Sequence, residues 1–390
     1  MKKIILAFDS FKGSAGSLDI ARYARQAIRK ELPYCEVLEF PVADGGEGTT
    51  EAICTALEVN KIFCEVHDPL MNPVEVSYGI TKDGATAILE MASASGLPLV
   101  AFPLRNPMNT TSYGTGEVIL DALNRGCRQF IVGLGGGKVL DICKYAAYVS
   151  KTKFISIPTI VSNDGIASPI AVLKRQDGKP KSLGCAIPYA LFVDLEVIMK
   201  SPIKYIKAGI GDTLSNYTAL YDWKLAVKAK KETMKDLAYL MSSTALDTLL
   251  NCRFTQMDYP FIKSLVQSLV LSGIAMDFAG TSRPCSGAEH LFSHALDYYS
   301  KQTNLHGLQV ALGSIVMAKL QNRKYDFLLT YLKNFDVQIN PKILNITKED
   351  FILCMNKAKS LRPDKYTILD EVTLNDALLS SIYDELCEEL

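Results

Sequence analysis

The chain has 390 residues, of which 48% are hydrophobic and 22% are charged. This composition supports a large buried core, and the length is enough for two domains of roughly 100 to 200 residues each. Lysine plus arginine and aspartate plus glutamate number 42 each, so no net charge attracts nucleic acid or an anionic membrane. The balanced charge therefore argues against both of these partners.

The amino terminus and the cysteines point to a protein of the cytoplasm. The start, MKKIILAFDS, has an apolar run of only five residues, which is too short for a signal peptide or a membrane span. The ten cysteines lie far apart and form no CxxC pair, which is typical of reduced thiols rather than of a disulfide scaffold. We therefore expect a cytoplasmic protein without membrane insertion.

Short apolar runs alternate with helical patterns over the first 170 residues. Alternating strands and helices indicate βαβ units and a mostly parallel sheet of the dinucleotide-binding type. We expect this α/β domain to span residues 1–198. The predicted strands are residues 3–10, 35–42, 85–92, 129–136 and 153–158, and the predicted helices are residues 18–32, 49–57, 116–126 and 139–149.

The stretch QFIVGLGGGKVLDICKYAA, residues 129–147, combines a strand, three glycines and the first turns of a helix. Glycines allow backbone N–H groups to approach an anion closely, and the N-terminus of a helix adds the positive end of its dipole. Residues Gly135, Gly136 and Gly137 therefore predict a turn that binds phosphate.

A second polar cluster, PTIVSNDGIASP, follows the predicted strand 153–158. Its side chains Ser162, Asn163, Asp164 and Ser168 come after the C-terminal end of a parallel strand, where ligands usually bind in such sheets. The alternative is a turn that is rich in Asx residues and has no ligand.

From about residue 200 the pattern changes to long windows with helical spacing, which predicts a largely α-helical domain over residues 199–390. Three of the four histidines, His290, His294 and His306, fall within one short window of it. Residues four apart share a helix face, so spacing alone pairs His290 with His294 as metal ligands. The alternative for each of these histidines is a position at the surface or at the edge of the core.

Asp212 lies in the stretch AGIGDTLSNY, between glycines at the start of a helical run. From spacing alone, a metal ligand and a helix cap are equally good interpretations of Asp212.

Motifs between residues 131 and 325 resemble the sn-glycerol-1-phosphate dehydrogenases, a branch of the metal-dependent dehydrogenases related to glycerol dehydrogenase and 3-dehydroquinate synthase. The motifs occur in the order and spacing of that family, and SRPCSGAEHLFSHA separates this branch from plain glycerol dehydrogenases. They are GGGKVLDICKYAA, IPTIVSNDGIASPIAVL, GIGDTLSNYTALYDWKLA, AGTSRPCSGAEHLFSHALD and LHGLQVALG.

The resemblance implies an α/β domain followed by an α-helical metal-binding domain, with Asp212, His290 and His306 binding one divalent metal, zinc before nickel or iron. It also implies that Asp164 and His294 contact the substrate. The resemblance thus gives His294 a substrate contact, whereas spacing alone makes it a metal ligand. The residues that it implies for binding NAD or NADP are Gly135, Gly136, Gly137, Lys138, Val139, Thr159, Ser162 and Ser168.

The same resemblance implies the interconversion of sn-glycerol 1-phosphate, or a closely related glycerol-type polyol, and dihydroxyacetone phosphate. It also implies a small phosphorylated polyol as the substrate and a homo-oligomer. Arg283, just before the histidine-containing helix, is a candidate phosphate contact, because a planar guanidinium matches a phosphate dianion. A salt bridge or a helix-entry contact is the alternative for Arg283.

Residues 1–134 resemble instead the N-terminal part of the glycerate kinases, through DSFKGS, PVADGGEGT, ILEMASASGL and TTSYGTGEVILDAL. The chain therefore looks like a hybrid that joins the two families within the glycine turn, with residues 135–198 on the dehydrogenase side. The alternatives to a dehydrogenase are a glycerate kinase-like phosphotransferase and a hybrid inactive in both reactions. Residues that would keep a glycerate or phosphate pocket, or else serve only as turn residues, are Asp9, Ser10, Lys12, Asp44 and Glu47.

Overall fold

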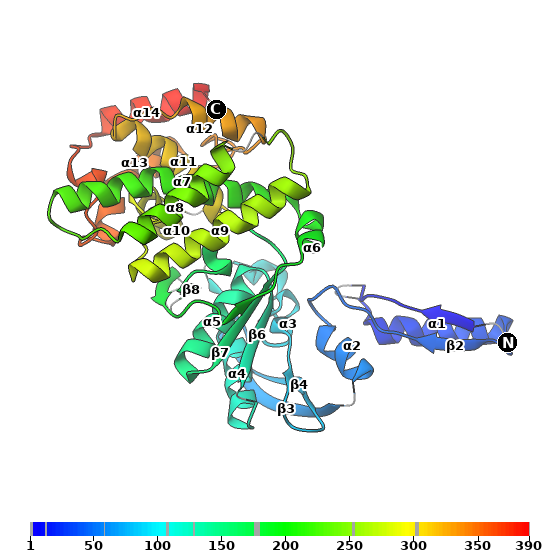
Figure 1. Cartoon of the computed structure of the whole chain (residues 1–390). Helices are drawn as coiled ribbons and strands as arrows, with labels where there is room; N and C mark the ends of the chain where they lie inside the picture. The colour runs from blue at the N-terminus through cyan, green and yellow to red at the C-terminus, as the bar shows by residue number, and fades with distance from the viewer. Residues whose placement is uncertain are drawn as a thin grey trace. The chain divides into compact units, whose positions relative to one another are not determined.

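The computed structural model describes residues 3–11, 14–57, 59–106, 109–127, 129–174, 180–251, 254–300 and 304–389 (Figure 1). The chain divides into two units. The first comprises Met1–Ile131, Val149–Thr152 and Lys174–Lys179, and the second comprises Val132–Tyr148, Lys153–Leu173 and Pro180–Leu390. The main division thus falls close to the predicted junction of the two family resemblances, while most of residues 132–198 belongs to the same unit as the helical region.

The first unit begins with a βαβ element. Strand β1 (Lys3–Leu6) is followed by α1 (Ser17–Glu31) and by β2 (Glu36–Glu39), and the two strands pair in parallel with Lys3 opposite Glu36. Helix α2 (Thr49–Ala56) comes next. The parallel pairing predicted for the start of the chain is confirmed here.

The middle of the first unit is antiparallel, so the prediction of a mostly parallel sheet is wrong for this part. Strands β3 (Val59–His67), β4 (Pro73–Thr81) and β5 (Ala87–Ile88) form one antiparallel sheet. The physical reason is the short turn after His67, in which the Asp68 carboxylate accepts the backbone N–H groups of Leu70 and Asn72 at 2.7 and 2.9 Å. A turn this short joins antiparallel neighbours, whereas a parallel pair needs a long crossover.

One face of this antiparallel sheet packs against helix α4 (Tyr113–Asn124) and the short helix α3 (Met91–Ser95). Two 3-10 turns, η1 (Leu97–Leu99) and η2 (Phe102–Leu104), connect these helices. The buried side chains that form this core are Val66, Val76, Tyr78, Ile80, Ala94, Val118 and Ala122.

The second unit contains the remaining α/β elements. Strand β6 (Phe130–Gly135) leads through the glycine turn into α5 (Gly137–Ser150), and β7 (Lys153–Pro158) lies between β6 and β10 (Ala190–Leu191) in one sheet. Strands β7 and β10 are parallel. The polar segment after β7 forms the 3-10 turn η4 (Asp164–Ile166), and β8 (Ile170–Lys174) pairs with β9 (Pro180–Gly184) in a separate two-stranded sheet.

The rest of the second unit is helical, and the helices from α7 onwards gather in one bundle (Figure 1). Trp223 has no exposed surface and packs with Leu220, Ala238 and Ala279. An α/β part followed by an α-helical part is therefore the observed architecture. The helices are α6 (Leu195–Lys200), α7 (Ile203–Lys228), α8 (Asp236–Asn251), α9 (Tyr259–Ala279), α10 (Ala288–Tyr299), α11 (His306–Leu320), α12 (Asp326–Asn334), α13 (Lys348–Ala358) and α14 (Asp376–Glu389), with 3-10 turns η5 (Lys359–Leu361) and η6 (Ile368–Asp370).

Helix α9 is long and apolar enough to cross a membrane. However, 56% of its most apolar window is buried inside the protein. Its buried face includes Phe261, Leu265 and Leu269, which have no exposed surface. These are the properties of a core helix, so length and hydropathy carry little weight here as evidence for a membrane span.

Candidate functional site

Asp212, His290 and His306 converge within the second unit, each from a different helix. One nitrogen or oxygen atom from each side chain lies within 4.8 Å of the other two. The Nε2 atom of His306 is 3.8 Å from Oδ1 of Asp212, and the ring centroids of His290 and His306 are 5.0 Å apart. Two imidazoles and one carboxylate are a donor set that suits a divalent cation with an open coordination position.

The close approach of α7 and α11 brings two of these side chains together. A Cβ atom on Gly307 would lie 1.9 Å from the carbonyl oxygen of Ala208, and one on Gly211 would lie 2.2 Å from the carbonyl oxygen of Gly307. No larger residue fits at either position without moving a backbone. Because Asp212 follows Gly211 and His306 precedes Gly307, the contact between the two helices also sets the distance between these side chains.

The Nδ1 atom of each cluster histidine has a partner on α10. Nδ1 of His290 is 2.9 Å from Oε1 of Glu289, and Nδ1 of His306 is 3.1 Å from Oγ of Ser293. Glu289 in turn accepts a hydrogen bond from the Thr218 hydroxyl at 2.9 Å. These contacts fix the ring orientations and leave Nε2 of both histidines for the cluster, as is usual for histidines that bind metal.

His294 lies beside this cluster rather than in it. Its ring centroid is 6.4 Å from that of His290 and 6.0 Å from that of His306. Burial lowers the pKa of His294 to about 3, and the nearby charges of His290, Lys365 and Arg362 act in the same direction. The imidazole is therefore neutral near pH 7, and it can donate or accept a hydrogen bond beside the cluster.

The turn η4 is held next to the cluster from two sides. The backbone N–H of Asp164 donates to Oδ2 of Asp212 at 2.8 Å. From α5, the buried Lys144 ammonium donates to the carbonyl oxygens of Gly165 and Ile170, both at 2.7 Å. Lys144 was not among the predicted site residues, although a lysine within the apolar run of a helix indicates a buried partner.

Burial dominates the electrostatics of the two carboxyl groups that meet at this turn. It raises the pKa of Asp212, and the neighbouring Asp164 carboxyl raises it further. Burial likewise raises the pKa of Asp164, while the nearby charges of His290 and Lys144 oppose the rise. A positive charge near these two carboxyl groups would favour their ionised forms.

The glycine turn Gly135–Gly137 joins the end of β6 to the start of α5. Gly135 has φ of 153°, a conformation that L side chains rarely adopt, and its carbonyl oxygen accepts the backbone N–H of Thr159 at 3.0 Å. A Cβ atom on Gly136 would contact Ile160 at 3.1 Å, whereas one on Gly137 would meet no atom within 4 Å. The open space at the helix N-terminus therefore lies at Gly137, as an anion-binding turn requires.

The other predicted cofactor residues differ in their exposure. Lys138 is exposed at the first turn of α5, and the Val139 side chain lies against Gly135. Ser162 is half-buried in the segment that leads to η4. Ser168 is only 2% exposed and lies in close contact with Gly273 of α9. The hydroxyl of Ser162 is thus the more accessible of the two serines.

Arg283 is engaged in structural contacts. Its residue surface is 2% exposed, its Nε atom donates to Oε1 of Glu232 at 3.1 Å, and its Nη1 atom donates to the carbonyl oxygen of Tyr366 at 2.5 Å. Arg283 therefore forms a salt bridge with Glu232, which was the alternative prediction for this residue. A role for Arg283 as a phosphate contact is therefore not supported.

The residues of the kinase-like segment make local turn contacts. Oδ1 of Asp9 accepts the backbone N–H of Ser10 at 2.7 Å, and Oδ1 of Asp44 accepts that of Gly46 at 3.0 Å. Lys12 lies outside the described residues. These contacts match the alternative in which such residues serve as turn residues.

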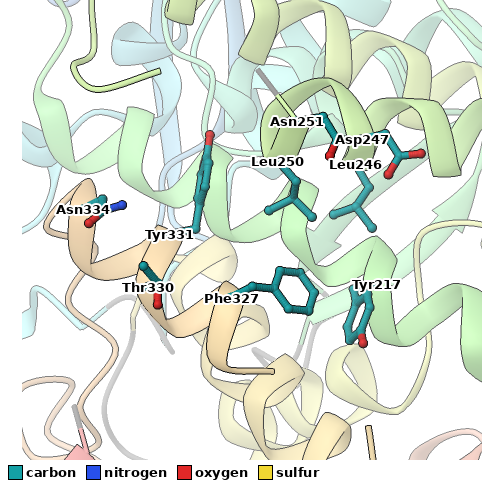
Figure 2. A pocket seen from close by; sticks show the side chains of 9 residues that line it. All are labelled: Tyr217, Leu246, Asp247, Leu250, Asn251, Phe327, Thr330, Tyr331 and Asn334. Atoms are coloured by element: carbon teal, nitrogen blue, oxygen red, sulfur yellow. The ribbon is translucent and has the colours of Figure 1, made fainter. Parts of the chain in front are cut away.

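A pocket with a volume of about 590 Å³ lies on the helical part of the second unit, where α7, α8 and α12 meet (Figure 2). Tyr217 lies five residues after Asp212 on α7, which places the two side chains on faces about 140° apart. The pocket thus opens on another side of α7 from the cluster. Its lining residues are Tyr217, Leu246, Asp247, Leu250, Asn251, Phe327, Thr330, Tyr331 and Asn334.

Two families match different parts of the chain. The sequence model of the glycerate kinase family matches residues 4–144, and that of the iron-containing alcohol dehydrogenases matches residues 87–202. The two matches overlap around the glycine turn, in agreement with the hybrid that the sequence predicts.

Solved structures show the same fold. Glycerol dehydrogenase from Schizosaccharomyces pombe aligns with a TM-score of 0.55 and 22% identity, over 70% of this chain and 73% of its own. Sulfoacetaldehyde reductase from Bifidobacterium kashiwanohense, solved in complex with NAD+, aligns with a TM-score of 0.54 and 16% identity, over 70% of this chain and 80% of its own. At these identities the likeness concerns the fold alone.

Curated relatives are much more similar in sequence. Glycerol-1-phosphate dehydrogenase (NAD(P)+) of Metallosphaera sedula is 39% identical over 245 residues, which are 62% of this chain and 70% of the relative. The enzyme of the same name from Sulfolobus acidocaldarius is 37% identical over 266 residues, which are 68% of this chain and 76% of the relative. From this similarity, the chain belongs to the glycerol-1-phosphate dehydrogenase family.

Proposed function

We propose that the protein is a metal-dependent, NAD(P)-linked oxidoreductase that interconverts sn-glycerol 1-phosphate and dihydroxyacetone phosphate. The observation that carries the proposal is the convergence of Asp212, His290 and His306 from three helices. The family to which the chain belongs supports the reaction and the cofactor class, since its members are named for both. The substrate is thus a small phosphorylated polyol, and we further propose a homo-oligomer in the cytoplasm.

Asp212, His290 and His306 would hold the cation, and we assign zinc because two imidazoles and a carboxylate are common ligands of a catalytic zinc ion. When bound, the cation supplies Lewis-acid polarisation of a substrate oxygen, and the nicotinamide supplies hydride chemistry. The glycine turn at Gly135, Gly136 and Gly137 would bind the pyrophosphate through the N-terminus of α5.

His294 and Asp164 are the residues that we assign to the substrate. His294 lies beside the cluster with a neutral imidazole, so it can bind a substrate hydroxyl by a hydrogen bond. The backbone N–H of Asp164, rather than its carboxyl group, donates the hydrogen bond to Asp212. The Asp164 carboxyl group can therefore bind a substrate hydroxyl. These two side chains would orient the hydroxyl groups and pass the proton between substrate and solvent.

The test is the oxidation of NADH and NADPH with dihydroxyacetone phosphate after zinc is returned to metal-stripped protein. We expect activity to return with zinc, and we expect Asp212→Ala to lose both bound zinc and activity. Asp247→Ala, which removes an exposed carboxylate from the pocket on the other side of α7, is the matched control and should retain both. Full zinc retention by Asp212→Ala would refute the ligand assignment.

Two rival functions predict different results. A glycerate kinase-like phosphotransferase would consume ATP with D-glycerate, but its family match ends at residue 144, before the cluster of Asp212, His290 and His306. A hybrid inactive in both reactions would bind zinc, remain folded and oxidise neither cofactor.

A further inference from the structure

Lys365 is a buried cation whose side-chain hydrogen-bond partners carry no negative charge. The residue is 8% exposed, and its Nζ atom donates to Oγ of Ser286 at 2.7 Å and to Oγ of Ser282 at 3.3 Å. Within the described residues these hydrogen-bond partners are hydroxyl groups rather than carboxylates. A buried ammonium is costly without an anion, so this site favours a negatively charged ligand.

The charges around Lys365 do not offset the effect of burial on its ammonium group. Burial lowers the pKa of Lys365 to about 7. The charge of Glu289 opposes this fall, the charges of Arg283 and Arg362 add to it, and Asp222 opposes it more weakly. A bound dianion would reverse this imbalance and stabilise the charged form.

Arg362 shares a turn with Lys365. The backbone N–H of Lys365 donates to the carbonyl oxygen of Arg362 at 3.1 Å, and the Lys359 ammonium fixes the turn by donating to the carbonyl oxygen of Lys365 at 3.0 Å and to Asp370 at 2.8 Å. The Arg362 side chain is exposed, so its guanidinium is available to a ligand.

The 3-10 turn η5, which leads into this turn, packs against α10, the helix that carries His290 and His294. Both Lys365 and Arg362 act electrostatically on His294, after burial and His290. Ser286, which holds the Lys365 ammonium, lies just before α10, the helix that carries His290 and His294. The two cations are therefore near the proposed substrate contact and outside the set of metal ligands.

We infer that Lys365 and Arg362 bind the phosphate group of the substrate, with Ser282 and Ser286 orienting the ammonium. Two cations match the charge of a phosphate dianion, and a guanidinium can bind it through two parallel hydrogen bonds. The inference rests on the proposed function, and it assigns to these side chains the preference for a phosphorylated substrate over the free polyol or ketone.

The experiment measures the affinity of the full-length, zinc-loaded protein for inorganic phosphate and for dihydroxyacetone phosphate by phosphorus NMR titration. Lys365→Met and Arg362→Ala should each weaken both affinities about tenfold or more. Lys348→Met, which removes an ammonium paired with Asp384 on the helical part, should leave them unchanged. In steady-state assays, the KM for dihydroxyacetone phosphate should rise while that for unphosphorylated dihydroxyacetone stays constant.

Unchanged phosphate affinity in Arg362→Ala, an exposed position that does not threaten folding, would overturn the inference, as would an equal loss for both ketones. If Lys365→Met does not fold, Arg362→Ala decides alone. Zinc content and NADH affinity, measured on the same samples, test the proposed function separately. Inorganic phosphate binding that depends on Lys365 and Arg362 would support the phosphate site even in protein that fails to retain zinc or NADH.

Discussion

Glu289 stands behind one of the proposed metal ligands. It has no exposed surface and contacts Nδ1 of His290, Thr218 and the backbone N–H of Gly287. Burial acts to raise its pKa, but the hydrogen bond and the charge of His290 outweigh burial and lower it, so the carboxylate stays ionised. His306 is instead backed by the neutral hydroxyl of Ser293.

This difference predicts unequal effects on metal affinity. Glu289→Gln keeps the shape and the acceptor but removes the charge that polarises His290, so zinc affinity should fall about 10- to 100-fold. Ser293→Ala, which removes only a neutral contact of His306, should have a smaller effect. Competition with a chelator measures both affinities. Zinc binding by Glu289→Gln as tight as in the unaltered protein would contradict this account.

In the first unit, the buried hydroxyl of Tyr78 depends on Asp121. Tyr78 is 1% exposed, its hydroxyl donates to Oδ2 of Asp121 at 2.6 Å, and Arg125 donates to the same oxygen at 2.8 Å. Asp121→Ala leaves this hydroxyl without its partner, so the free energy of unfolding of this unit should fall by about 1–3 kcal/mol. Urea unfolding followed by circular dichroism measures this loss of stability. Asp19→Ala, a substitution at an exposed position of α1, is the control.

The effect of Asp121 should depend on pH in a defined direction. Burial raises the pKa of Asp121, but hydrogen bonds from Arg125 and Tyr78 outweigh burial, so its pKa is below the ordinary 3.8. A lowered pKa in the folded state gives stability that is present above 3.8 and is lost as the pH falls through the folded value. The difference between Asp121→Ala and the unaltered protein should therefore be constant near neutral pH and shrink only in strong acid.

At the scale of elements, the contact between α7 and α11 decides the geometry of the cluster. Gly307→Ala would place a Cβ atom 1.9 Å from the carbonyl oxygen of Ala208 and force the two helices apart. We expect a stability loss of about 1–3 kcal/mol and weaker zinc binding, because Asp212 and His306 separate with the helices. Gly116→Ala, on α4 with open space around its Cβ, is the matched helical control. Unchanged zinc affinity in Gly307→Ala would contradict the link.

The same contact shows what the sequence could predict of the site. Spacing correctly placed His290 and His294 on one helix, because residues four apart are a local property. Spacing could not show that α11 returns to pack on α7 and brings His306 to Asp212, since that contact is tertiary. Only the family resemblance predicted the three residues that the structure brings together.

Local patterns were also sufficient for some elements and not for others. The βαβ start, the glycine turn before α5 and the helical second half follow from periodicity and glycine placement. The hairpin of β3 and β4 was missed, although apolar residues alternate along β4 and the Asp68–Asn72 turn follows β3 directly. The rest of the segment alternates strands with helices, and that pattern predicts parallel strands joined by crossovers rather than a hairpin.

At the scale of the molecule, the two units carry different parts of the chemistry. Asp212, His290 and His306 all belong to the second unit, as does Trp223, the only tryptophan of the chain. Trp223 lies on α7 together with Asp212 and is fully buried, so its fluorescence reports the unfolding of the second unit. The first unit, which contains most of the kinase-like segment, contributes none of the proposed metal ligands.

Zinc should therefore stabilise one unit selectively. A ligand that binds only the folded state raises stability by about 2.7 kcal/mol at a free concentration of 100 times its Kd. We expect zinc to raise the melting temperature seen by Trp223 fluorescence by several degrees, and to leave unchanged any transition that circular dichroism detects without a change in fluorescence. Asp212→Ala should abolish the shift because it removes a ligand from the second unit. A zinc-induced shift confined to the fluorescence-silent transition would place the metal in the first unit and refute the site.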